Sequence, residues 1–81
     1  MSISIEFLGM QRILTKTDGI DIPLTHRMIV NDVLEYVREH YPALNLDEGT
    51  VLITVNQKIA HVGRVLRADD TVSFLPFICG G

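Results

Sequence analysis

Residues 30–41 read VNDVLEYVREHY and combine a helical repeat with a stop signal. Their apolar side chains recur at intervals of three and four residues, which places them in one stripe along a helix. Pro42 ends the pattern, because proline disfavours helical geometry in the preceding residue and cannot continue the hydrogen-bond ladder. Asp32 and Glu35 have capping-box spacing, but a helix that began there would leave Val30 outside. The sequence therefore leaves the first residue of the helix undetermined to within one turn. The stretch predicts one amphipathic helix.

Two strand-like segments precede this helix. Residues 2–8 alternate apolar and polar side chains, the period of a strand, and residues 20–25 repeat the pattern. Asp18 and Gly19 lie between them and predict a tight hairpin turn, because glycine accepts the positive φ that such turns need. Pro23 cannot donate a ladder hydrogen bond, so we expect the second strand at a sheet edge.

Three more strand-like segments follow the helix, separated by turn residues at 56–57 and 69–70: residues 50–55, 58–60 and 71–77. The order of elements predicts an α+β fold in which a mixed sheet of four to five strands carries one main helix on one face. It suits the β-grasp arrangement, with the last strand parallel to the first at the sheet centre.

Length and composition favour a single packed domain over residues 1–81, with a tail from about residue 77. Apolar residues make up 47% of the 81, so a globular core is expected. The formal charge is −3 and the seven basic residues are scattered, which argues against a nucleic-acid partner. The apolar runs are too short for a membrane span, the start does not resemble a signal peptide, and a single cysteine excludes an internal disulfide framework. We expect a cytoplasmic protein that does not bind membranes.

The last predicted strand runs directly into FICGG, residues 77–81. Glycine has no Cβ, so two in a row let the backbone pass through a narrow tunnel and approach another active site closely. The carboxylate of Gly81 would be open to attack once adenylation converts it to a mixed anhydride. A frayed end that happens to be glycine is the alternative.

Three segments resemble the MoaD/ThiS family of ubiquitin-like sulfur carriers, closest to the small subunit of molybdopterin synthase. They read IEFLGMQR at residues 5–12, TVNQKI at 54–59 and DDTVSFLPFICGG at 69–81. The resemblance implies a ubiquitin-like β-grasp fold and a Gly81 carboxylate that a ubiquitin-activating-type enzyme adenylates with ATP. The product is converted to a thiocarboxylate, which donates sulfur in molybdopterin biosynthesis.

The resemblance also implies that the chain is not an enzyme by itself. It would bind no cofactor and act as the sulfur-donating subunit of a larger complex, while Gly80, Cys79 and Ile78 thread the tail into a partner. Three alternatives share the activation chemistry: a sulfur carrier of the thiamine pathway, a sulfur carrier for transfer-RNA thiolation, and a protein modifier that is conjugated to lysines. A non-covalent β-grasp binding module is the alternative from a different class.

A partner surface is predicted on the sheet face opposite the helix. If Phe74 faces the helix, alternation places Leu75 and Phe77 on the other face, and the same argument applies to Leu8. The resemblance adds Ile59. We expect this patch to dock onto the adenylating enzyme and onto a sulfur acceptor such as the molybdopterin synthase large subunit; ordinary surface apolarity is the alternative.

The remaining reactive residues predict no catalytic or metal site. Cys79 could relay sulfur, or could simply be a small tolerated residue. His26, His40 and His61 lack the spacing of zinc ligands.

Overall fold

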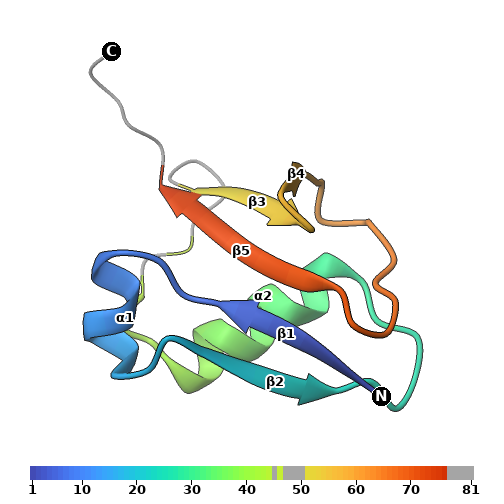
Figure 1. Cartoon of the computed structure of the whole chain (residues 1–81), viewed down its shortest axis with the longest axis horizontal. Helices are drawn as coiled ribbons and strands as arrows, with labels where there is room; N and C mark the ends of the chain where they lie inside the picture. Colours follow the sequence, from blue (N-terminus) through green and yellow to red (C-terminus); the bar gives the residue numbers. More distant parts are fainter. Residues whose placement is uncertain (45, 47–50, 77–81) are drawn as a thin grey trace.

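The fold is a mixed β-sheet with one long helix across one face, shown in Figure 1. The computed structural model describes residues 1–44, 46 and 51–76. Within these residues the elements are β1 (Ser2–Glu6), α1 (Met10–Thr15), β2 (Gly19–Pro23), α2 (Val30–His40), β3 (Val51–Val55), β4 (Lys58–Ile59) and β5 (Thr71–Pro76). The strand order is β2-β1-β5-β3-β4, and β1 and β5 are parallel. This arrangement confirms the predicted ubiquitin-like β-grasp fold, including the edge position of Pro23.

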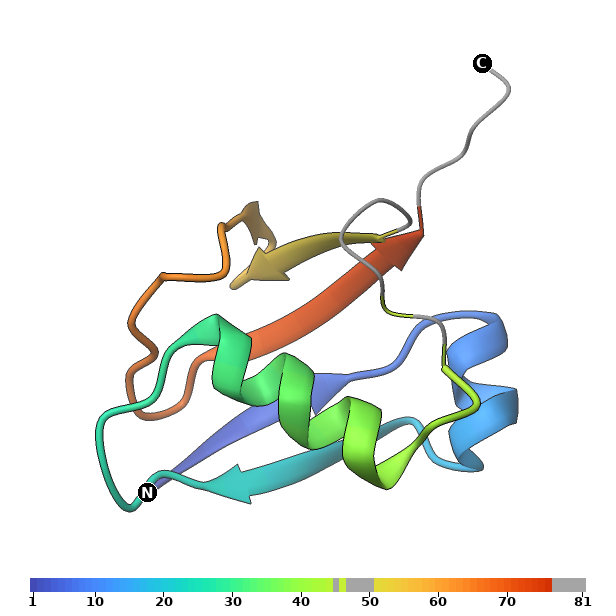
Figure 2. The ribbon, with the colours of Figure 1, turned by 180° about the vertical axis from the view of Figure 1, so that it is seen from behind.

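The core lies between the sheet and α2, which Figure 2 shows crossing the back of the sheet. Each strand turns every second side chain toward α2, so alternate residues of the central strands are buried. The apolar stripe of α2 faces these side chains and is buried as well. Among the described residues, ten side chains are less than 2% exposed: Ile3, Ile5, Phe7, Val30, Val33, Leu34, Val37, Val55, Val72 and Phe74. The side chains facing the opposite direction are left as a separate, uncovered face.

Helix α2 begins at Val30 and ends before Tyr41, which settles the boundary that the sequence left open. Asp32 lies in the first turn, where its Oδ2 accepts a hydrogen bond of 2.8 Å from the backbone N–H of Ile29. This bond satisfies one of the donors that a helix start leaves without a partner. At the other end, the N–H of Tyr41 donates to the carbonyl of Val37 at 2.7 Å.

The predicted tight hairpin turn at Asp18 and Gly19 is wrong, because the helix α1 lies between β1 and β2. Gly19 is the first residue of β2, and φ is positive instead at Gly9, the residue before α1. A Cβ at Gly19 would lie 2.5 Å from the backbone oxygen of Ile5. Glycine is therefore required there for the close approach of two strands and not for a turn conformation.

Both turns predicted near the C-terminal strands are confirmed. Asn56 and Gln57 have φ of 52° and 70°, the two positive values that a two-residue hairpin connection uses. At the second turn, the buried carboxylate of Asp70 accepts hydrogen bonds from Asn56 Nδ2 at 2.9 Å and from the N–H of Arg67 at 2.8 Å. Asp70 thereby joins the β3–β4 turn to the start of β5.

Several predicted positions lie outside the described residues. These are Thr50 at the start of one predicted strand and Phe77, Ile78, Cys79, Gly80 and Gly81 at the end of the chain. Among the residues that are described, no helix is both long and apolar enough to cross a membrane.

Candidate functional site

The end of β5 carries an apolar pair on the sheet face away from α2. Leu75 follows the buried Phe74, so its side chain points to the opposite face, where it is 38% exposed. Its register partner on β3 is Leu52, which is half-buried and lies between the buried Val51 and Ile53. Directly opposed side chains on antiparallel strands have Cβ atoms ~4.5–5.5 Å apart, so these two leucines form one surface.

Ile59 adds a third exposed apolar side chain to this face. It pairs in register with Thr54 on β3, and Thr54 pairs in turn with Ser73 on β5. Register partners share a face, so Ile59 projects on the same side of the sheet as Leu75, and it is 72% exposed. The structure thus places two of the predicted patch residues, Leu75 and Ile59, on the same face of the sheet, and Leu52 lies on the strand between them. We call Leu52, Ile59 and Leu75 the apolar patch.

Leu8 and Phe77, the other two predicted patch residues, have a different status. β1 ends at Glu6, so strand alternation does not extend to Leu8, which is half-buried just before α1. Its N–H donates to Gln11 Oε1 at 3.0 Å. Phe77 lies outside the described residues, together with the tail residues Ile78 to Gly81.

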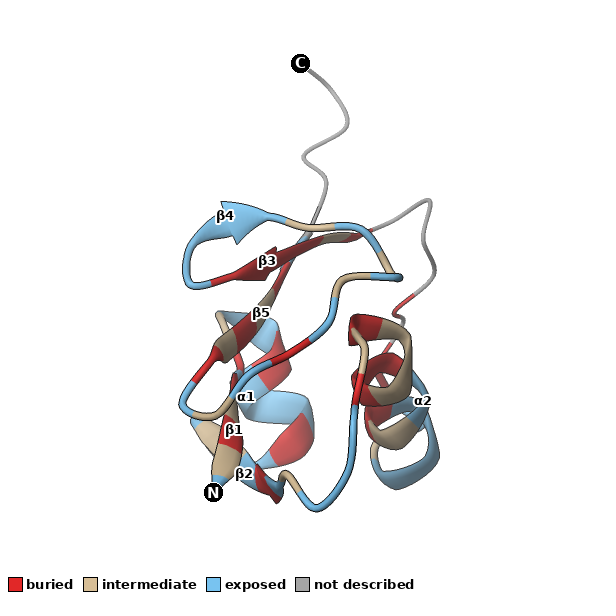
Figure 3. Cartoon of the chain, turned by 90° about the vertical axis from the view of Figure 1, so that its right-hand side faces the viewer, coloured by how far each residue is buried: buried red, intermediate tan, exposed pale blue. Residues whose placement is uncertain are grey.

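The rest of the uncovered face is polar. Ser4 Oγ donates to Asp21 Oδ1 at 2.9 Å, and a shallow hollow is lined by Glu6, Asn56, Gln57, Thr71 and Ser73. Within the apolar patch, Leu52 and Leu75 lie near the end of the sheet from which residues 77–81 continue, whereas Ile59 lies level with Ser73, nearer the middle of β5. Figure 3 shows this side of the sheet free of α2.

Helix α1 carries a second group of exposed apolar side chains. Met10, Ile13 and Leu14 are 65%, 68% and 46% exposed, and their spacing places them on one helix face. Gln11 and Thr15 are the buried residues of the helix, and Gln11 donates from Nε2 to the carbonyl of Phe74 at 2.8 Å. This bond fixes α1 beside the end of β5.

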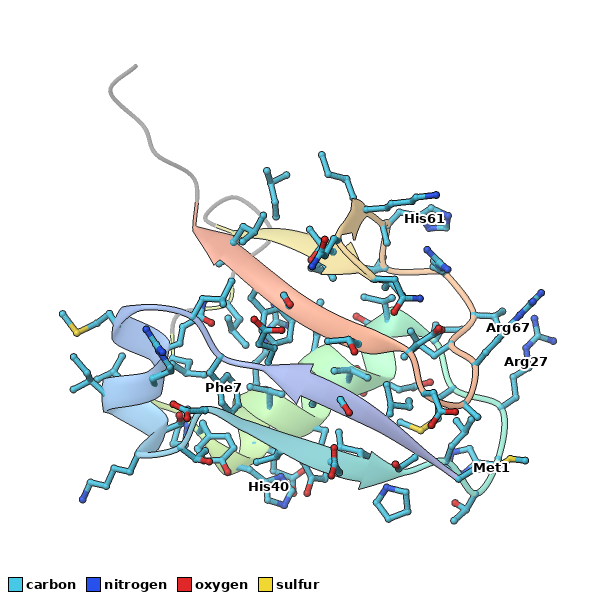
Figure 4. The ribbon with its side chains drawn as sticks, viewed as in Figure 1. Met1, Phe7, Arg27, His40, His61 and Arg67 are labelled. Carbon is cyan, nitrogen blue, oxygen red and sulfur yellow. The ribbon has the colours of Figure 1, made fainter. Side chains whose placement is uncertain are left out.

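The described residues contain no group of three side chains that could hold a metal ion. Each histidine has a local partner instead. His40 stacks on Tyr36 with 4.0 Å between ring centroids, His61 Nδ1 bonds the N–H of Gly63, and His26 Nδ1 bonds Thr25 Oγ1. Figure 4 shows His40 and His61 at opposite edges of the molecule, so they do not form a common site.

A β-grasp sheet with exposed apolar side chains on the face away from α2, whose last strand leads into a Gly-Gly sequence, is typical of small ubiquitin-like proteins of the carrier and modifier class. Within that class, the chain belongs to the ThiS family, whose model matches residues 5–81. The match includes Gly80 and Gly81. No curated protein matches the sequence significantly.

Solved structures of low identity share the fold over nearly the whole chain. A candidate subunit 1 of the molybdopterin-converting factor from Pyrococcus furiosus has a TM-score of 0.82 at 21% identity, covering 96% of this chain and 99% of that one. SAMP1 from Haloferax volcanii has a TM-score of 0.81 at 17% identity, with both chains fully covered. The complex of subunits 1 and 2 of the molybdopterin-converting factor from Helicobacter pylori 26695 gives 0.65 at 22% identity, again with full coverage of both chains.

Sequence patterns had not pointed to Leu52 or to α1. The segment around Leu52 is apolar at nearly every position, so only the register with β5 shows which side chains face outward. For α1, the spacing of Met10, Ile13 and Leu14 was the available signal, since it repeats at three and four residues.

Proposed function

We propose that the chain is a sulfur carrier whose reactive group is the carboxylate of Gly81, and that it donates sulfur in molybdopterin biosynthesis. The observation that carries the proposal is the ThiS-family match, which extends through Gly81. The position of the apolar patch supports it, because Leu75 lies six residues before Gly81 on the strand that leads into the tail.

The chemistry requires activation of an unreactive carboxylate by another enzyme. A carboxylate oxygen of Gly81 attacks the α-phosphorus of ATP, pyrophosphate leaves, and an acyl-adenylate forms. A sulfur nucleophile at the oxidation level of hydrosulfide then attacks the carbonyl carbon, AMP leaves with the carboxyl oxygen, and one proton is released. The product is a thiocarboxylate, and neither step changes an oxidation state. The chain itself supplies the acyl group and the docking surface, and ATP is used by the partner.

Two partners follow from this scheme: an adenylating enzyme of the ubiquitin-activating type, and a sulfur acceptor such as the large subunit of molybdopterin synthase. The apolar patch, extended by Leu8 and Phe77, is the proposed docking surface for both, and Gly80, Cys79 and Ile78 are the proposed threading segment. The Helicobacter pylori complex of two converting-factor subunits supports a partner of the second kind. The single cysteine supports a cytoplasmic setting.

A second candidate is conjugation of Gly81 to lysines of other proteins. The structural likeness to SAMP1, described in another structure as small archaeal modifier protein 1, supports conjugation as the second candidate function. It shares the adenylation step and differs only in the nucleophile, which is a lysine amine in place of sulfur.

The experiment that tests the shared step is ATP–pyrophosphate exchange with the adenylating enzyme of the same organism. We expect exchange with the full chain and none with a chain that ends at Cys79, although both have the same thermal midpoint. A folded full chain that supports no exchange would overturn the proposal.

A further inference from the structure

Gln11 is a buried glutamine whose side-chain amide bonds two backbone groups from different parts of the chain. It is only 9% exposed. Its Oε1 accepts from the N–H of Leu8 at 3.0 Å, and its Nε2 donates to the carbonyl of Phe74 at 2.8 Å, across 63 residues of sequence. Buried polar groups of this kind are nearly always bonded, and removing one partner leaves the others unsatisfied.

The position of this bond is explained by the length of β1. The parallel β1–β5 ladder ends where Glu6 pairs with Ser73, so β5 has no strand neighbour on that side from Phe74 onward. On the other side, β3 still pairs with Leu75 and Pro76. The amide of Gln11 therefore replaces the missing strand at the first position that β1 no longer covers.

The backbone of Gln11 is fixed by hydrogen bonds within and next to α1. Its backbone N–H donates to the carbonyl of Leu8 at 3.0 Å, and its own carbonyl accepts from Thr15 Oγ1 at 2.8 Å. Together with the side-chain bond to Leu8, these contacts fix the amide relative to the end of β1. Because both ends of the amide are bonded, the side chain is ordered and holds the Phe74 carbonyl at a fixed place relative to the end of β1.

The carbonyl that Gln11 binds belongs to Phe74, which lies on β5 shortly before the tail begins. Five residues follow Pro76, and a fully extended chain of that length spans at most ~18 Å. Because the reach is so short, a shift of β5 at Phe74 moves the carboxylate of Gly81 relative to any enzyme docked on the apolar patch. Small misplacements of a reacting group lower the rate of the chemical step more than they lower binding.

We propose that Gln11 is a positioning residue for the activation of Gly81, acting through its hydrogen bond to the Phe74 carbonyl. This role rests on the proposed function above. It divides the work between two parts of the molecule. The apolar patch sets how tightly the adenylating enzyme binds, and the Gln11 bond sets how often the bound tail is in the reactive geometry.

Two substitutions separate the two bonds of the amide. Gln11→Met keeps the length of the side chain and removes both bonds, whereas Gln11→Glu can still accept from Leu8 and, when ionised, cannot donate to Phe74. Gln57 is an exposed glutamine in the β3–β4 turn, so Gln57→Met and Gln57→Glu are matched controls. All four variants and the wild type are assayed for steady-state adenylation at a temperature well below their measured thermal midpoints.

We expect kcat to fall on the order of fivefold in both Gln11 variants, the factor that one lost hydrogen bond of ~1 kcal/mol gives, with KM unchanged. The Gln57 variants should match the wild type. A purely structural role would lower the thermal midpoint and leave kcat of the folded protein unchanged. Gln11 variants with wild-type kcat, or with a change in KM alone, overturn the role while the proposed function stands. A wild-type chain that is not adenylated removes the proposed function and this role with it.

Discussion

Leu52 and Leu75 face each other in register across β3 and β5, on the side of the sheet that α2 leaves uncovered. Neither side chain contributes to the core between the sheet and α2, because the other faces of β3 and β5 supply the core residues. Paired apolar side chains beside the start of residues 77–81 form a surface suited to contact with another protein.

Replacing Leu75 with glutamate should weaken binding to the adenylating enzyme about tenfold or more, because burying a leucine contributes ~1.5–3 kcal/mol and 1.4 kcal/mol corresponds to a factor of ten. Leu52→Glu should do the same. Isothermal titration against the enzyme and against the sulfur acceptor measures both. Val65 is similarly exposed, at 40%, but lies in the segment of chain that connects β4 to β5, outside the apolar patch. Val65→Glu is therefore the matched control and should bind normally. Folded Leu52 and Leu75 variants with wild-type affinity for both partners would show that the patch is ordinary surface.

Adding a methyl group at Gly80 should slow adenylation and leave the fold intact. The physical reason is steric, because a Cβ would have to enter the narrow passage through which the tail reaches the active site. The rate of pyrophosphate exchange for Gly80→Ala measures the effect, and a thermal melt confirms folding. An unchanged rate in the variant would contradict the passage argument.

Gly19→Ala should destabilise the protein by ~1–3 kcal/mol, because the new Cβ would lie 2.5 Å from the Ile5 carbonyl oxygen and push β1 and β2 apart. Urea denaturation followed by circular dichroism gives the change in the free energy of unfolding. At Gly63 a Cβ would meet only the ring of the exposed His61, at 3.2 Å, so Gly63→Ala serves as the control and should cost much less. Equal losses at the two sites would mean that the strand contact can relax.

Asp70→Ala should cost ~1–3 kcal/mol of unfolding free energy, because it leaves the N–H of Arg67 and the amide of Asn56 without their acceptor. The same denaturation experiment applies. Asp18 is an exposed acid whose removal should change stability by less than ~0.5 kcal/mol, so Asp18→Ala is the comparison. If Asp70→Ala were as stable as Asp18→Ala, the junction between the β3–β4 turn and β5 would not depend on the carboxylate.

The sequence predicted α2 and the sheet because their patterns are strong. The aliphatic residues of α2 fall on one stripe that is buried in the structure, and β1 and β2 alternate regularly enough to show their period. The parallel placement of β5 beside β1 followed from the order of the elements.

The sequence analysis did not predict helix α1, in which polar residues are buried and apolar residues are exposed. The polar Gln11 is buried, while Met10, Ile13 and Leu14 face outward, so the hydrophobic periodicity marks the exposed face of the helix and not the face that packs. Its place is fixed by a hydrogen bond to Phe74, 63 residues away, which no local pattern can reveal. Leu52 was missed for a related reason, since a strand that is apolar throughout shows its outer face only once the register is known.

The proposed chemistry is tested most directly by mass spectrometry of the chain isolated from its own organism. The account predicts a species in which sulfur replaces one carboxyl oxygen of Gly81. Oxidation of any of the three methionines gives nearly the same mass gain, so fragmentation must place the gain on the C-terminal residue. Sulfur at Gly81 is the predicted result. A C-terminus that remains an ordinary carboxylate under conditions where the adenylating enzyme is active, or that is recovered only as a branched peptide on lysines of other proteins, would contradict the sulfur-carrier account.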